Sequence, residues 1–188
     1  MHEVRIADAQ RDVRRTYVGG FFGQLVSGAV WLVAAAVGTW GSTGAAVAGL
    51  WLGGMLIFPL TTLALKVSGR PPSLPAGHPM APLAVQIAFT VPLGLLVALA
   101  LAGERPELFF PASMIIVGAH YLPFVFLYGM RLFAVLAALL VGGGVVLAMT
   151  GAAPFSLGAW LTGTALVIFA FLLRASLRGE PEGARSRA

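Results

Sequence analysis

The residues of this chain best placed to do chemistry are polar side chains inside long apolar segments. His120 is the ionisable group deepest in such a segment, within the run Val117 to Pro123 (VGAHYLP). An imidazole at that depth can shuttle a proton or bind a polar ligand. The alternative is a neutral histidine that hydrogen-bonds a neighbouring helix. The sequence leaves both roles open.

Other polar side chains fall at a similar level when each apolar segment is measured from its more basic end. At 1.5 Å per helical residue, Gln24 lies about 10 Å, Gln86 about 8 Å and Thr90 about 13 Å from that end. We expect a ligand-binding level in this half of the protein. Its candidate residues are His120, Gln86, Gln24, Thr90 and Tyr121. Alternatively, these side chains join helices, at about 0.6–2 kcal/mol per interhelical hydrogen bond.

Prolines interrupt three successive apolar segments at the same level. Pro59, Pro92 and Pro123 each remove a backbone N–H and free the carbonyl four residues earlier. A freed carbonyl in lipid needs a partner or a water-lined cavity. We therefore expect the three proline-containing segments to surround a polar cavity near His120. Ordinary helix kinking is the alternative.

Several kinds of chemistry lack the residues they need. The chain contains no cysteine, and no Asp, Glu, Lys or Arg lies within the apolar segments, so thiolate chemistry and carboxylate proton relays are excluded there. His2, His78 and His120 are far apart in the expected topology, so they are not expected to bind one metal ion together. We predict no metal site, no cofactor and no enzymatic activity.

The elements that must position these residues are membrane spans. With 59% hydrophobic and 10% charged residues, the chain departs strongly from soluble proteins, in which about 25% of residues are charged. Each apolar segment is near the roughly 20 residues that cross a bilayer as a helix. We predict an all-α bundle of six transmembrane helices. The predicted spans are Val18 to Trp40, Gly44 to Leu65, Ala81 to Ala102, Leu108 to Gly129, Leu132 to Thr150 and Ser156 to Leu173.

Basic residues are divided very unequally between the two sides of these spans. Of the 12 Lys and Arg residues, all but Arg105 fall on the side that holds both termini. Such asymmetry orients membrane proteins with the basic side in the cytoplasm. We therefore expect both termini in the cytoplasm. Arginine greatly outnumbers lysine and Ala, Gly and Val are abundant, which suggests GC-rich codons and a bacterial inner (plasma) membrane.

The two ends of the chain differ from the spans between them. In residues 1–17, apolar residues recur at helical spacing from Ile6 to Tyr17. This pattern predicts an amphipathic helix on the inner membrane surface, with a solvated tail as the alternative. We expect residues 18–173 to form the transmembrane domain. Residues 174–188 are rich in Arg, Glu, Gly and Ser, and we expect a disordered cytoplasmic tail.

Three runs of sequence carry a resemblance to known proteins. They are Gly53 to Leu60 (GGMLIFPL), Ser68 to Pro71 (SGRP) and Phe109 to Arg131 (FFPASMIIVGAHYLPFVFLYGMR). The chain resembles, over about half its length, a family of small multi-pass bacterial membrane proteins known only as a domain of unknown function. The resemblance implies a membrane protein and supplies no activity, ligand or site residue.

Two functional hypotheses follow, and an intramembrane enzyme trails both because no catalytic group is present. The first is a carrier or channel-like protein for a small neutral or weakly basic solute. The second is a non-catalytic membrane component that packs against a second copy or a partner protein through glycine-rich faces. The lipid bilayer is a partner in either case. The net charge is +5, but the charged residues flank apolar spans, so we expect no nucleic-acid partner.

Overall fold

The computed structural model describes residues 5–151 and 153–178. In this part of the chain the regular structure is helical, and six helices are long and apolar enough to cross a membrane. The prediction of an all-α six-span protein is confirmed. These helices are α2 (Phe21–Trp40), α3 (Thr43–Val67), α4 (Ala81–Glu104), α5 (Phe109–Tyr128), α6 (Leu132–Thr150) and α7 (Leu157–Arg178).

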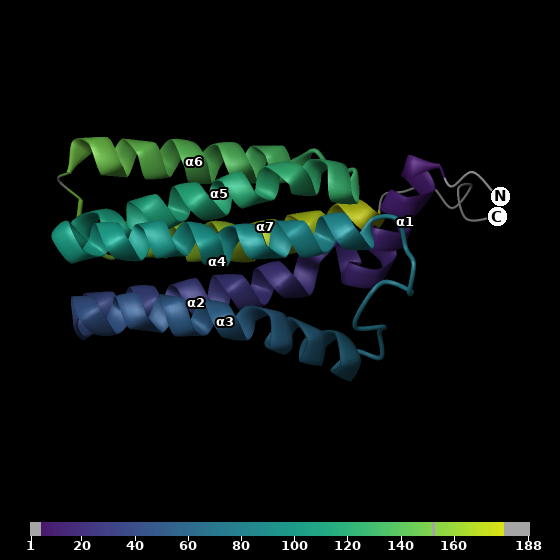
Figure 1. Ribbon diagram of the computed structural model, residues 1–188, viewed down its shortest axis with the longest axis horizontal. Helices are drawn as coiled ribbons and strands as arrows, with labels where there is room; N and C mark the ends of the chain where they lie inside the picture. The colour runs from purple at the N-terminus through teal and green to yellow at the C-terminus, as the bar shows by residue number, and fades with distance from the viewer. Residues whose placement is uncertain (1–4, 152, 179–188) are drawn as a thin grey trace.

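The six helices run side by side along the long axis of the molecule (Figure 1). Helix α5 packs closely on α6 and α4, and α2 packs closely on α3 and α7. Helices α3 and α4 are the least covered: only 11% and 17% of their most apolar windows are buried, against 44% for α5 and α7. The interior therefore lies among α2, α5, α6 and α7, and α3 and α4 flank it.

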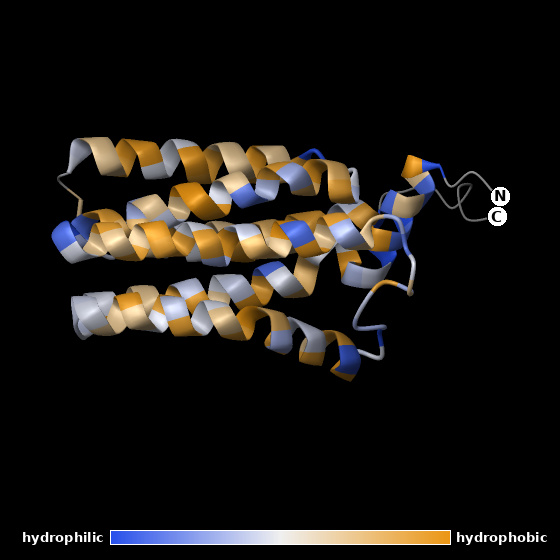
Figure 2. Cartoon of the chain, viewed as in Figure 1, coloured by the Kyte–Doolittle hydropathy of each residue, from blue (hydrophilic) through white to orange (hydrophobic). Residues whose placement is uncertain are grey.

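Polar residues gather at the end of the bundle that carries α1 (Ile6–Tyr17). Figure 2 shows apolar colours along most of each long helix and hydrophilic colours on α1 and the α3–α4 connection. We call this the α1 end, and the opposite end the far end. The described basic residues at the α1 end are Arg5, Arg11, Arg14, Arg15, Lys66, Arg70, Arg131, Arg174 and Arg178, with Arg105 at the far end.

Helix α1 is a separate element and not an extension of α2. The short turn η1 (Val18–Gly20) joins them, and its three residues have φ of 52°, 63° and 86°. A left-handed conformation is uncommon for a β-branched residue such as Val18 and costs about 1–2 kcal/mol. The turn brings α1 against the bundle, where Ala9 is 2% and Val13 0% exposed. The apolar face that we expected to lie on lipid is thus partly buried in protein.

Close helix approach at two places depends on glycine. Between α5 and α6, a Cβ on Gly118 would lie 2.9 Å from the backbone N of Val141, and one on Gly144 2.8 Å from the carbonyl O of Pro111. Small residues at such crossings let membrane helices approach backbone to backbone. This contact fixes the position of α5, the helix that carries His120 and Tyr121.

The end of the last helix differs from the predicted span. Helix α7 continues five residues beyond Leu173, to Arg178, and so includes the first part of the segment that we expected to be disordered. In this extension Leu177 packs against the η1 turn: a Cβ placed on Gly19 would lie 3.1 Å from the Cδ1 atom of Leu177. Residues 179–188 lie outside the described residues. Pro59 lies inside α3, and α3 diverges from α2 toward the α1 end of the bundle (Figure 1).

Candidate functional site

One face of α2 points toward α5 in the half of the bundle near α1. A Cβ on Gly20 would lie 3.8 Å from the Cζ atom of Tyr128, and the Ser27 side chain lies close to that of Tyr121. Gln24 lies four residues after Gly20 and three before Ser27, so helical spacing places it on the same face. The Gln24 amide is therefore directed toward the part of α5 between Tyr121 and Tyr128.

An aromatic cluster occupies that part of the interior. It consists of Tyr121, Phe124 and Tyr128 from α5 and Phe133 from α6, and the ring of Phe133 lies 5.9, 5.3 and 5.0 Å from the three others. Phe133 is 0% exposed. Stacked, tilted and edge-on contacts at these distances stabilise such clusters. Large side chains, and not close backbone packing, thus fill the space between α2 and α5.

Gln24 has unused hydrogen-bonding capacity in this apolar setting. Its side chain is 2% exposed, and neither Oε1 nor Nε2 has a hydrogen-bond partner among the described residues. The Thr61 hydroxyl of α3, which packs near Gly23, is buried without a partner in the same part of the chain. An unsatisfied buried polar group costs about 1–3 kcal/mol. The site therefore holds an amide donor and acceptor that the fold leaves unpaired.

His120 lies at the α4–α5 interface. Its Nδ1 atom is 2.9 Å from Oγ1 of Thr90, and the Thr90 hydroxyl donates to the carbonyl O of Ile87 at 2.7 Å. With the threonine proton used in that bond, Nδ1 is the donor and Nε2 the acceptor of the neutral imidazole. The ring also contacts Phe124 at 4.9 Å and Tyr121 at 5.5 Å. This geometry suits both a joint between helices and a wall of the candidate site.

The predicted ligand level is divided by the structure into separate parts. Gln24 lies one turn from Ser27, whose side chain is close to Tyr121 in the interior, and His120 pairs with Thr90 at the edge of that interior. Gln86 is exposed, one turn from Thr90 on α4, and its side chain makes no hydrogen bond within the described part of the chain. Gln86 is thus not brought to His120, because equal depth does not fix rotation about the helix axis.

Two residues in this part of the interior were absent from our predicted site residues. Ser27 is 8% exposed and lies one turn from Gln24, a spacing that could have indicated a shared polar face. Phe133 reaches the site from α6, and no sequence signal distinguishes it from the many apolar residues of that span. Among the described residues, no group of three His, Asp or Glu side chains could hold a metal ion.

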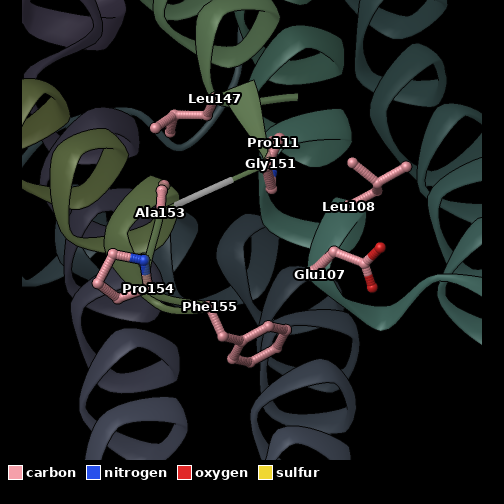
Figure 3. A pocket seen from close by; sticks show the side chains of 9 residues that line it. Glu107, Leu108, Pro111, Leu147, Gly151, Ala153, Pro154 and Phe155 are labelled. Carbon is pink, nitrogen blue, oxygen red and sulfur yellow. The ribbon is translucent and has the colours of Figure 1, made fainter. Parts of the chain in front are cut away.

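A small cavity lies at the far end, away from Gln24. It is lined by residues of η2 (Pro106–Leu108), the start of α5 and the α6–α7 connection, including Glu107, Pro111 and Phe155 (Figure 3). Its volume is about 10 Å³, which is room for roughly one water molecule. The Glu107 carboxylate accepts a hydrogen bond from Arg105 at 2.8 Å. This hollow is too small for a solute and is not the predicted polar cavity.

Comparison with known proteins places the chain in a family. The model of a family of unknown function, DUF7010, matches residues 6–176. The chain therefore belongs to that family, and the match includes α1, η1, helices α2 to α6 and all but the last two residues of α7. None of the curated proteins and none of the solved structures matches the chain.

Proposed function

We propose that this member of the DUF7010 family is a carrier or channel-like protein for a small neutral solute. The proposed binding residues are Gln24, Ser27 and Tyr121, with His120 and Thr90 at the edge of the site. The observation that carries the proposal is the Gln24 amide, which is 2% exposed and has no partner for either polar atom among the described residues.

The unpaired amide favours a ligand over a purely structural role. Glutamine in a membrane helix is normally retained because it hydrogen-bonds another helix. Gln24 makes no such bond within the described part of the chain. A bound solute or a file of waters would satisfy Oε1 and Nε2 together. The present packing then corresponds to a closed conformation.

The chemistry of the site limits the solute. Gln24 offers one acceptor and one donor side by side, and the neighbouring hydroxyls and aromatic faces add weak polar contacts. Within the predicted spans there is no Lys or Arg to bind an anion and no Asp or Glu to bind a cation. A small neutral molecule that both donates and accepts hydrogen bonds, such as an amide, fits this set best.

Ligand-dependent melting of the purified protein tests the proposal. The panel contains acetamide, glycerol, acetate and methylammonium, which separate neutral from charged solutes. We expect a neutral solute to raise the melting temperature of wild type and to have no effect on Gln24→Leu. His120→Ala should remain folded and lose most of the shift. Ser113→Ala is the matched control, since the Ser113 hydroxyl is also buried and unpartnered but lies in the far half of α5.

The outcomes separate the hypotheses. If no solute shifts wild-type melting and His120→Ala only melts earlier, the transport proposal fails and His120 is structural. If only methylammonium or acetate shifts wild type, a site exists but its solute class is wrong. If Gln24→Leu retains the full shift, binding occurs elsewhere.

The basic α1 end supports a particular orientation of the carrier. All but one of the described Lys and Arg residues lie at that end, as the positive-inside rule requires of a cytoplasmic side. We place α1 and the end of α7 in the cytoplasm, and the far end outside. A bacterial inner membrane is the proposed location.

The weak packing of α3 supports the second candidate, a non-catalytic component that binds another membrane protein. Phe58 is 76% exposed and Leu56 54% exposed on a helix whose apolar window is only 11% buried. A second copy or a partner helix could cover this face. Cross-linking in membranes through Phe58→Cys tests it: a specific dimer or heterodimer supports the partner role, and unlinked monomer indicates that lipid covers α3.

A further inference from the structure

We infer that α1 is a movable gate over the cytoplasmic side of the candidate site, held closed by hydrogen bonds to the end of α5. The inference rests on the proposed function for its purpose. The contacts that hold α1 in place, and the residues that α1 covers, do not depend on that function.

The fastening consists of side chains that bind backbone carbonyls. The last carbonyls of a helix have no partner within the helix. Nε2 of Gln10 donates to the carbonyl O of Phe126 at 2.5 Å, and Nη1 of Arg14 donates to that of Tyr128 at 2.7 Å. The positive guanidinium at this position also matches the negative end of the α5 dipole. Two residues one turn apart on α1 thus cap α5 from outside.

The fastened helix covers the aromatic cluster at its cytoplasmic end. Tyr128 is the last residue of α5 and is 6% exposed. The η1 turn that follows α1 lies directly on the cluster, since a Cβ on Gly20 would be 3.2 Å from the Phe133 ring. On α1 itself, Val13 is 0% exposed. A path from the cytoplasm to Gln24 along this face of α2 must therefore pass α1 and η1.

The junction with α2 is built as a hinge. Val18, Gly19 and Gly20 are all left-handed, a conformation that two of the three adopt freely because they are glycine. Val18 does not, so the docked position holds some backbone strain. A junction that changes φ and ψ in two glycines can swing α1 without disturbing α2.

The α3–α4 connection fastens α1 from its other side. Nη1 of Arg70 donates to the carbonyl O of Arg15 at 3.2 Å, and Nε2 of His78 lies 3.7 Å from Oδ2 of Asp12. Helix α1 therefore links α5 to this connection, and the flanking helices α3 and α4 are the least buried of the six. Release of α1 would free the two sides of the bundle from each other at the cytoplasmic end.

Because the chain contains no cysteine, a single introduced thiol can report the gate. Ser27→Cys places the thiol beside Tyr121, about 9 Å along α2 from its first residue. The full-length protein in inside-out vesicles is treated with a membrane-impermeant maleimide, with α1 either unchanged or carrying Gln10→Ala and Arg14→Ala. Arg11→Ala is the matched control, since its hydrogen bond joins Asp8 within α1 and not α5.

We expect the Gln10→Ala and Arg14→Ala pair to speed labelling of the thiol at position 27 at least fivefold, and Arg11→Ala to leave the rate unchanged. Equal rates in all three backgrounds would overturn the gate. A thiol introduced by Ser113→Cys, in the far half of α5, serves as the check on folding. If it is labelled faster as well, α1 supports the whole fold and the gate is rejected. No solute is used, so a failed gate is distinguishable from a failed binding site, which the melting panel reports.

Discussion

Replacing Gln24 by leucine should make the protein more stable. The two side chains are of similar size, and the position is 2% exposed with no hydrogen-bond partner for either amide atom among the described residues. Removing an unsatisfied buried polar group recovers about 1–3 kcal/mol. If Gln24 instead joined helices by hydrogen bonds, the same change would cost about 0.6–2 kcal/mol. The two interpretations thus predict opposite signs.

Unfolding in detergent, followed by tryptophan fluorescence, measures this difference. Trp31 is 2% exposed on α2, two turns from Gln24, and reports its surroundings. For a chain of this size, 1 kcal/mol corresponds to about 2–4 °C in melting temperature. We expect Gln24→Leu to melt several degrees higher than wild type. A melting temperature below that of wild type would refute the idea that the amide is unpaired.

Gln24→Glu is the companion variant that tests burial. An ionised carboxylate at this position would lose its hydration, at several kcal/mol. We expect strong destabilisation at neutral pH. A variant as stable as wild type would mean that water reaches position 24 in the resting protein.

If Gln24→Leu is more stable than wild type and has also lost solute binding, Gln24 behaves as a functional residue that is retained at a cost to the stability of the fold.

Three further predictions concern packing and topology. Thr90→Val should lower stability by about 0.6–2 kcal/mol by removing the hydrogen-bond partner of His120, and a double-mutant cycle with His120→Ala measures the coupling. Gly144→Ala should destabilise the protein by about 1–3 kcal/mol, because the new methyl group would overpack against α5. Gly142→Ala, on the same helix, is the control: a Cβ there would meet nothing within 4 Å, so the change should be neutral or stabilising by up to about 1 kcal/mol. The same unfolding assay compares the two variants. Reporter fusions should be cytoplasmic after Arg178 and external at Glu104, and a cytoplasmic signal at Glu104 would contradict the spans.

The six spans could be predicted because their signal is local. Each needs only a run of apolar residues near the length of a bilayer crossing, and Gly, Pro and charged residues end the runs. The distribution of arginine likewise predicted that the segments before the first span and after the last span lie on the same side, and α1 and the end of α7 lie at the same end of the bundle (Figure 1). The family resemblance, which was carried by three runs of sequence, is confirmed by a match over residues 6–176.

The site was only partly predictable, because rotation about a helix axis depends on packing. Gln24 and Gln86 have nearly equal expected depths, yet Gln24 is buried and Gln86 exposed. The difference arises because α2 packs between α3 and α7, whereas α4 contacts mainly α5. The docking of α1 was missed for a similar reason: an amphipathic pattern does not show whether lipid or protein covers the apolar face.

Solute flux into proteoliposomes tests the central claim most directly. Vesicles containing the purified protein are mixed with a hyperosmotic solution of acetamide or glycerol, and the rate of volume recovery is followed by light scattering. We expect faster recovery with wild type than with empty vesicles, loss of that increment with Gln24→Leu, and retention with Ser113→Ala. Recovery no faster than in empty vesicles for every neutral solute, or an increment that survives Gln24→Leu, would contradict the account.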